Sequence, residues 1–129
     1  MKYVYSAIFT KLENDEYSVE IPDLPGCITC GYGLAETIFM ASDAMAMWLW
    51  DAEKKKENIP KPKKIESVEK NQFVNLIVAD TDDYRKRHEN RAVKKTLSIP
   101  SWLNSEAEQA GVNFSQVLQE ALREKLKTE

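Results

Sequence analysis

Residues 93–99 carry the side chains of this sequence that are best spaced for recognition chemistry. Apolar and polar residues alternate there, a period-two pattern typical of a β-strand with two unlike faces. Lys94, Thr96 and Ser98 supply the polar face, and Lys95 interrupts the alternation on the apolar side. One ammonium group and two hydroxyls can hydrogen-bond to base edges in the major groove of DNA, which admits a two-stranded ribbon. The pattern therefore predicts a strand that contacts DNA after pairing with a second copy.

Two helices are predicted after this strand, up to residue 127. Pro100 suits a helix start, and Gly111 ends the first helix, because glycine readily adopts the left-handed conformation found there. Asn113 is expected to cap the second helix, with Gln116 three residues on in the capping-box arrangement. That helix carries an apolar stripe at helical spacing, made of Phe114, Val117, Leu118, Ala121, Leu122 and Leu126. A unit this small cannot bury such a stripe, so we expect it to fold as a dimer.

Over residues 92–127 the sequence resembles the ribbon-helix-helix family of DNA-binding proteins, of the Arc and MetJ type. The resemblance implies base contacts from the polar face of the strand and phosphate contacts from the start of the second helix. A helix N-terminus also favours anions on physical grounds, because its free amides and the helix dipole are positive. The predicted DNA-binding residues are Lys94, Lys95, Thr96, Ser98, Asn113, Phe114 and Ser115. An ordinary helical hairpin beside a solvated strand is the alternative.

The charge distribution fits a protein whose DNA contacts are confined to one region. The formal net charge of the chain is −3, which is not that of a generally basic nucleic-acid binder. Between Arg85 and Lys95, however, six basic residues stand against one acidic residue, Glu89. Such a stretch can neutralise phosphates and release their counterions. By itself a basic run is better explained as a solvated segment, and its position beside the predicted strand favours DNA binding.

Neither a metal site nor an enzyme active site is predicted. Cys27 and Cys30 have a C-x-x-C spacing, but they fall in an apparent strand and not at a helix N-terminus, where the pKa of a thiol is lowered. A zinc site would need two further ligands, and His88 is the only histidine. The carboxylates of the first half are not spaced to meet at one point, as two-metal catalysis requires. These carboxylates are Glu20, Asp23, Asp43 and Asp51. We therefore expect no cofactor, no metal and no catalysis.

The first half of the sequence predicts an α+β fold in β-β-β-α-β order. The predicted strands cover residues 3–10, 17–21, 27–32 and 72–79. The last of them has apolar residues at both odd and even positions, and therefore on both faces of the strand. This predicts a position away from the sheet edge. A helix is predicted over residues 34–56, and Phe39, Met47 and Trp50 cannot all lie on the face that covers the sheet. We expect this helix to lie in an oligomer interface or to meet a partner.

The β-β-β-α-β pattern of the first half and the strand-helix-helix pattern of the last third divide the chain into domains. We predict an N-terminal domain over residues 1–80 and a C-terminal dimerisation and DNA-binding domain over residues 92–129. Residues 81–91 form a linker or a short helix, which Thr81 can cap ahead of two aspartates in the first turn.

A second resemblance rests on motifs from both halves of the chain. The residues that carry it are Val19-Glu20-Ile21, Pro22-Asp23-Leu24-Pro25-Gly26-Cys27, Thr29, Gly31, Asn58-Ile59-Pro60 and Asn113-Phe114-Ser115-Gln116-Val117-Leu118-Gln119. With these motifs nearly the whole chain resembles a HicB antitoxin of the ribbon-helix-helix subtype. The chain departs from that family at Gly33, where a serine or threonine cap is usual, and in the Met and Trp content of its long helix.

This resemblance implies a degenerate ribonuclease-H-like N-terminal domain that binds and blocks a HicA toxin. Such a toxin is a small basic ribonuclease with a double-stranded-RNA-binding fold and a catalytic histidine. The resemblance also implies that the C-terminal domain forms a homodimer, binds operator DNA and represses the operon. It assigns no toxin-contact residues.

The charge of the N-terminal domain suits a basic partner. Residues 1–53 hold two lysines and nine carboxylates, which gives this segment a formal net charge of −7. Such a field should speed association with a cationic protein. The alternative function is a free-standing ribbon-helix-helix repressor whose N-terminal domain senses a small ligand. A small basic reading frame beside the gene would favour the antitoxin.

The sequence predicts a cytoplasmic protein. The N-terminus enters a strand pattern at once and shows no signal peptide, and no stretch approaches a membrane span of about 20 apolar residues. Two cysteines without other thiols fit a reducing compartment.

Overall fold

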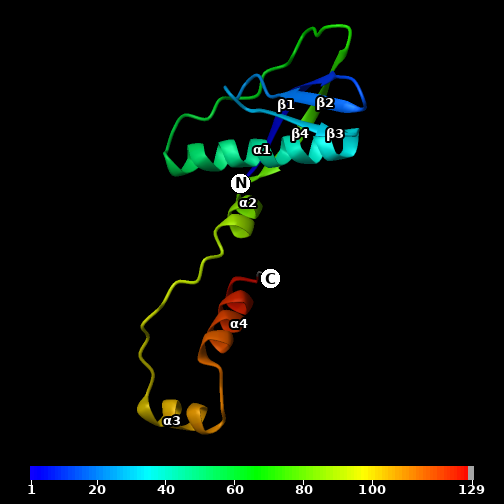
Figure 1. The fold of residues 1–129 in the computed structure, drawn as a ribbon. Helices are drawn as coiled ribbons and strands as arrows, with labels where there is room; N and C mark the ends of the chain where they lie inside the picture. The colour runs from blue at the N-terminus through cyan, green and yellow to red at the C-terminus, as the bar shows by residue number, and fades with distance from the viewer. Residues whose placement is uncertain (128–129) are drawn as a thin grey trace. The chain divides into compact units, whose positions relative to one another are not determined.

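The computed structural model describes residues 1–127, which form two compact units. The first unit, Met1–Arg91, holds a four-stranded sheet and two helices, and the second unit, from Ala92 onward, holds two further helices. The described chain is therefore an α+β protein, as the sequence predicted (Figure 1).

The sheet of the first unit has the order β3-β2-β1-β4, and all neighbouring strands are antiparallel. Its strands are β1 (Lys2–Lys11), β2 (Glu16–Glu20), β3 (Ile28–Tyr32) and β4 (Gln72–Asp80). Each lies within about one residue of its predicted position, because alternation marks a half-buried strand clearly. Figure 1 shows helix α1 (Leu34–Lys54) lying along one face of this sheet. We call the opposite face the open face.

Helix α1 covers the sheet with one buried residue per turn. Ala41, Met45 and Leu49 are completely buried and pack with Tyr5 and Phe9 of β1. Their spacing of four residues keeps them on one side of the helix. Burying a large apolar side chain contributes about 1.5–3 kcal/mol, so this layer is the main source of stability in the unit.

Gly31 lets the start of α1 approach β3 closely. A Cβ atom at this position would lie 2.9 Å from Thr37 Oγ1 and 3.0 Å from Thr37 Cα. Thr37 is buried, and its hydroxyl donates a hydrogen bond of 2.7 Å to the Gly33 carbonyl. Because the obstacle includes backbone and a fixed hydroxyl, the helix itself would have to move to admit a side chain.

We expect Gly31→Ala to lower the free energy of unfolding by about 1–3 kcal/mol, the usual cost of overpacking. Gly26→Ala is the control, since Gly26 has a positive φ of 80° but open space around it. Its cost should be about 1 kcal/mol, from the backbone conformation alone. Urea unfolding of both variants measures the two values. A smaller loss for Gly31→Ala than for Gly26→Ala would contradict the close approach.

A carboxylate near the end of α1 ties three elements together. Glu53 Oε2 accepts hydrogen bonds from the Tyr3 hydroxyl at 2.6 Å and from Thr81 Oγ1 at 3.0 Å. Tyr3 belongs to β1, and Thr81 is the first residue of α2 (Thr81–His88). The bonds therefore fix the end of the sheet to both helices.

Helix α2 packs as part of the first unit. The Tyr84 ring is nearly buried and lies 5.4 Å from the Trp50 ring, which accounts for one of the aromatic residues of α1 outside its sheet-facing side. The prediction that Thr81 caps this helix is wrong by one residue. Asp80 is the cap, and its carboxylate accepts from the N–H groups of Asp82 and Asp83. The Thr81 hydroxyl is instead engaged with Glu53.

The predicted interior position of β4 is also wrong, because β4 is an edge strand. Its inward residues Ile77 and Ala79 are buried, as expected for a strand on the core. The residues that alternate with them, Val74, Leu76 and Val78, lie on the open face. Their side chains have exposed fractions of 40%, 63% and 55%. The second apolar row therefore marks an uncovered surface and not a second layer of protein.

The second unit consists of α3 (Ser101–Gln109) and α4 (Phe114–Leu126). Gly111 separates them with a φ of 70°, and the Asn113 side chain caps α4 by accepting from the Gln116 N–H at 3.1 Å. The predicted capping box is only half formed, because the Gln116 side chain donates to Glu120 and does not accept a hydrogen bond from the Asn113 N–H.

The predicted strand over residues 93–99 is not a strand in the single chain. Residues 89–100 carry no regular secondary structure. The physical reason is that a strand needs a neighbouring strand to accept and donate its hydrogen bonds. Among the described residues of the second unit none is buried, so this unit has no core of its own.

Candidate functional site

The structure brings the segment 93–99 against the start and the middle of α4. One open hollow of about 700 Å³ is lined by Lys94, Lys95, Thr96 and Ser115 together with apolar residues of α4. A neighbouring hollow of about 460 Å³ is lined by Lys95, Ser115 and Phe114. Most of the predicted DNA-binding residues therefore lie within one region of the second unit.

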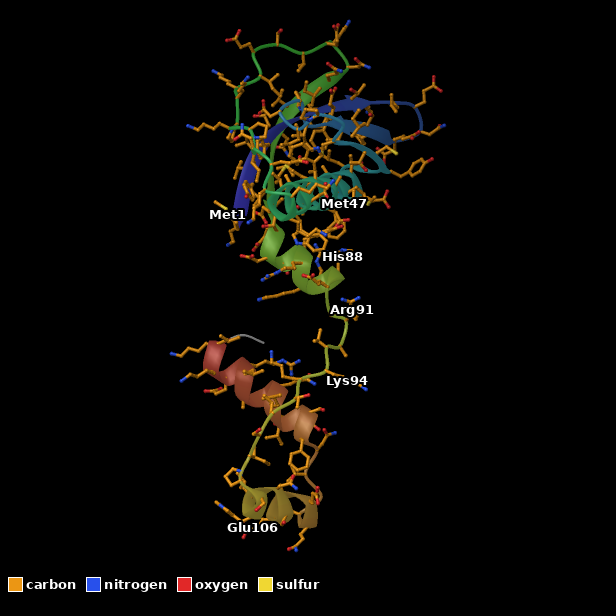
Figure 2. The ribbon with its side chains drawn as sticks, turned by 90° about the vertical axis from the view of Figure 1, so that its left-hand side faces the viewer. Met1, Met47, His88, Arg91, Lys94 and Glu106 are labelled. Carbon is orange, nitrogen blue, oxygen red and sulfur yellow. The ribbon has the colours of Figure 1, made fainter. Side chains whose placement is uncertain are left out.

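All the predicted DNA-binding residues are exposed. Figure 2 shows Lys94 on the segment that leads into α3. Ser98 lies on the same segment but lines neither hollow, and Asn113 is occupied in capping α4.

The first turn of α4 is arranged to accept an anion. The Gln116 N–H is taken by the Asn113 side chain, and the Val117 N–H donates to the Asn113 carbonyl. The N–H groups of Phe114 and Ser115 have no acceptor within the helix, as at every helix start. Because the helix dipole adds positive charge there, this turn can bind a phosphate group.

Apolar side chains line both hollows and were not among the predicted site residues. Leu97 contributes to both, Ile99 to the smaller and Leu122 to the larger. Leu97 and Leu122 are each at least half exposed. An apolar surface of this kind, on a unit without a core, is typical of a surface that packs against another protein. The alternation in residues 93–99 was the sequence signal for it.

The open face of the first unit changes in character across the sheet. Phe9 faces α1, so its neighbour Ile8 lies on the open face. Residues opposite one another in a strand pair share a face, so Glu20 lies there with Ile8. Glu16 has the same parity as Glu20, so the pair Glu16–Tyr32 lies on the open face too. The β2 and β3 side thus carries carboxylates, while the β4 side carries only apolar residues apart from its two ends. The structure therefore offers two unlike surfaces on one face.

The two cysteines have different surroundings and are both free thiols. Cys27 lies in the turn before β3 with only 4% of its surface exposed, and burial raises its pKa to about 11. Cys30 is exposed. A redox-active thiol needs a lowered pKa, so the environment of Cys27 is unsuited to that chemistry.

Cys27, which is buried, and Tyr3, which is partly buried, should make the stability of the first unit fall at high pH. Burial raises the pKa of Cys27 to about 11, and burial together with the Glu53 hydrogen bond raises the pKa of Tyr3 to about 12. Both folded-state pKa values lie above the ordinary values of 9.0 for a thiol and 10.0 for a tyrosine, so the contribution to stability is complete below about pH 9 and is lost as the pH rises toward 12. We expect the urea midpoint to decline over that range.

Cys27→Ala should reduce the slope of this decline between pH 9 and 11, because it removes one of the groups whose pKa is raised in the folded state. Cys30→Ala is the matched control and should leave the slope unchanged. An equal slope in wild type and Cys27→Ala would show that the thiol does not ionise on unfolding.

Two further features bear on function. Within residues 1–127 no three His, Cys, Asp or Glu side chains are grouped closely enough to hold a metal ion. None of the helices in that part of the chain has the length and apolar character needed to cross a membrane.

Comparison with known proteins identifies the family. Residues 5–121 match the family model of the HicB-like antitoxins of bacterial toxin-antitoxin systems. A 14.9 kDa protein from the rep-hol intergenic region of Haemophilus phage HP1 is 29% identical over 91 residues, which are 70% of this chain and 68% of that protein.

Solved structures show the same fold. A chain of a toxin-antitoxin complex from Streptococcus pneumoniae is similar over 97% of this chain and 99% of its own length, with a TM-score of 0.62 and 25% identity. The HicB antitoxin of Burkholderia pseudomallei is similar over 96% of each chain, with a TM-score of 0.53 and 16% identity, which supports the fold alone. The family match covers most of the chain and includes parts of both units, and so this protein belongs to the HicB-like antitoxins.

Proposed function

We propose that this protein is the antitoxin of a toxin-antitoxin pair. Its first unit, a degenerate ribonuclease-H-like domain, binds and blocks a HicA-type ribonuclease without catalytic activity of its own. Its second unit forms a ribbon-helix-helix homodimer in the cytoplasm, binds operator DNA and represses the operon. The observation that carries the proposal is the family match over residues 5–121, supported by the likeness to a chain of a toxin-antitoxin complex.

Inhibition of the toxin is proposed to be steric and electrostatic. A ribonuclease must present a cationic surface to hold RNA phosphates, and the first 53 residues of this chain carry a balance of −7. Glu16 and Glu20 place part of that charge on the open face beside β3. An acidic domain seated on the cationic surface excludes phosphate and raises the association rate.

DNA binding is proposed to require two copies of the second unit. When residues 93–99 of two copies pair antiparallel, each supplies the hydrogen bonds that the other lacks in the single chain. The alternation then buries Val93, Leu97 and Ile99 over α4 and directs the polar row outward. Lys94, Thr96 and Ser98 would face the bases, while the start of α4 would hold phosphates.

The proposal is tested by co-expression with the reading frame beside the gene. A histidine-tagged copy of this protein is expected to retain the small basic product of that frame in a pull-down. Co-expression should also restore the growth of cells that the small protein arrests. Arrest that persists despite soluble expression of both proteins, with no complex recovered, would overturn the antitoxin assignment.

A further inference from the structure

A lysine-rich segment of the first unit lies between α1 and β4. From Lys54 to Lys64 six lysines stand against one acidic residue, Glu57. We call residues 56–64 the strap, and Figure 1 shows it within the long connection that leaves the end of α1. The strap is a concentration of positive charge in a unit whose first 53 residues are strongly acidic, and toxin binding does not account for it.

Three contacts hold the strap against the first unit. The Tyr5 hydroxyl donates a hydrogen bond to the Pro60 carbonyl, and Ile59 packs against the core. The Lys63 N–H donates to the Asp23 carboxylate at 2.9 Å. The two prolines of the strap fix φ at their own positions and restrict the residues before them. The strap is therefore ordered before it meets a partner, which lowers the entropy cost of binding.

The lysines of the strap have no counter-charge. Just before the strap, Lys55 pairs with Asp51 at 3.0 Å, and the Lys54 ammonium lies 3.9 Å from the centre of the Trp50 ring. The ammonium groups of the strap, by contrast, form no ion pair with any described residue, and their side chains are exposed. They belong to Lys56, Lys61, Lys63 and Lys64. Such a row favours a polyanion that can meet several charges at once.

We propose that the strap binds the phosphate backbone of duplex DNA beside the operator. In the polyproline conformation, which rises about 3.1 Å per residue, Lys61 and Lys64 are about 9 Å apart. Each strand of the duplex presents a phosphate about every 3.4 Å along the helix axis, so this length can meet two or three of them. Lysine binds phosphate as a point charge and reads no base in doing so. The strap therefore adds affinity without adding sequence preference.

Attachment to the second unit favours DNA over other polyanions, and this step rests on the proposed operator binding by that unit. The strap begins beside α2, because Lys54 lies over the Trp50 ring and this ring contacts Tyr84. Residues 89–100, which follow α2, carry no regular secondary structure and can span no more than about 40 Å. A strap tethered in this way meets the phosphates beside a bound operator at a high effective concentration. A free RNA or an acidic protein lacks that advantage.

The strap and the proposed toxin surface lie on different faces of the sheet. Tyr5 belongs to the layer between the sheet and α1, so the strap borders the α1 side. Glu16 and Glu20 lie on the open face. One copy can therefore hold toxin and DNA at the same time, and changes in the strap should leave toxin inhibition intact.

The test is fluorescence anisotropy of the full-length protein with the operator and with a non-operator duplex of equal length, over a range of salt. Each phosphate contact contributes about 0.9 to the slope of log affinity against log salt. In a dimer, Lys61→Gln/Lys63→Gln/Lys64→Gln removes the strap charges of both copies. We expect the slope to become less steep by about 2–5 on both duplexes, and affinity at about 50 mM salt to fall at least roughly 10-fold.

Lys2→Gln/Lys11→Gln/Lys70→Gln is the matched control, because it removes the same charge from exposed lysines of the first unit outside the strap. It should change the slope by less than about 1, with circular dichroism showing that both variants are folded. An unchanged slope in the strap variant, or an equal change in the control, would overturn the inference even where the operator is still preferred.

Other outcomes separate this inference from the proposed function. A wild-type protein that binds both duplexes equally would overturn operator recognition by the second unit, while a smaller slope in the strap variant would still support the strap. Binding to neither duplex would overturn both. A greater loss on single-stranded RNA of equal length than on either duplex would assign the strap to RNA, and would overturn its assignment to DNA.

Chemical modification gives a second measurement that needs no substitution. Lysines of the free and the operator-bound protein are acetylated, and mass spectrometry follows the rate at each position. The three strap lysines should react several-fold more slowly in the complex, whereas the three control lysines should react at an unchanged rate. Equal protection of the two sets, or protection of neither, would contradict contact between the strap and DNA.

Discussion

Replacing Lys94 and Thr96 with alanine is expected to weaken operator binding roughly 1000-fold. In a dimer the double substitution removes four side chains, and each lost base contact costs about 1 kcal/mol or more. The side chains are exposed in the single chain, so the fold should not change. Fluorescence anisotropy with operator DNA at fixed salt measures the loss.

Lys125→Ala is the matched control for this substitution. Lys125 lies in the last turn of α4, at the opposite end of the helix from the anion-binding turn. It should change operator affinity by no more than a few-fold. The Lys94→Ala/Thr96→Ala variant should still inhibit the toxin, because the first unit is intact. Loss of both activities would contradict the division of labour between the two units.

Leu97→Glu is expected to abolish dimerisation of the second unit and with it all operator binding. Leu97 lines both hollows against α4, and the proposed ribbon buries it together with its copy. Two carboxylates buried in one apolar interface cost several kcal/mol, more than a small dimer can absorb. Anisotropy with operator DNA and proteolysis of the tail would both report the change.

Gln109→Glu adds the same charge at an exposed position at the end of α3 and should leave operator binding intact. The first unit of Leu97→Glu should remain folded, since it has a separate core. Its toxin inhibition should persist at saturating concentration. Unchanged operator binding by Leu97→Glu would show that residues 93–99 do not form the dimer ribbon.

The sequence predicted those elements whose partners lie within the same chain. The helix predicted after the third strand is present, and its residues Ala41, Met45 and Leu49, four positions apart, are buried against the sheet. The four strands of the sheet alternate clearly, and their positions are confirmed. Asn113 caps α4 as expected, because capping depends only on residues three positions apart.

The errors arose where one pattern fits two environments. Apolar residues at both odd and even positions of β4 fit a strand covered on both faces, and they fit equally an edge strand whose second apolar row is exposed. Residues 93–99 have the alternation of a strand but no partner within the chain. Thr81 is a good cap by residue type, yet tertiary contact with Glu53 takes its hydroxyl. In each case the deciding neighbour is distant in sequence or is absent from the single chain.

The most direct test of the account is RNA cleavage by the purified product of the neighbouring reading frame, titrated with this full-length protein. We predict that cleavage falls as the protein is added and ends when the toxin is saturated. Inhibition should weaken as salt is raised, because opposite charges attract the two proteins. Cleavage that continues unchanged in the presence of a large excess of folded protein would contradict the account.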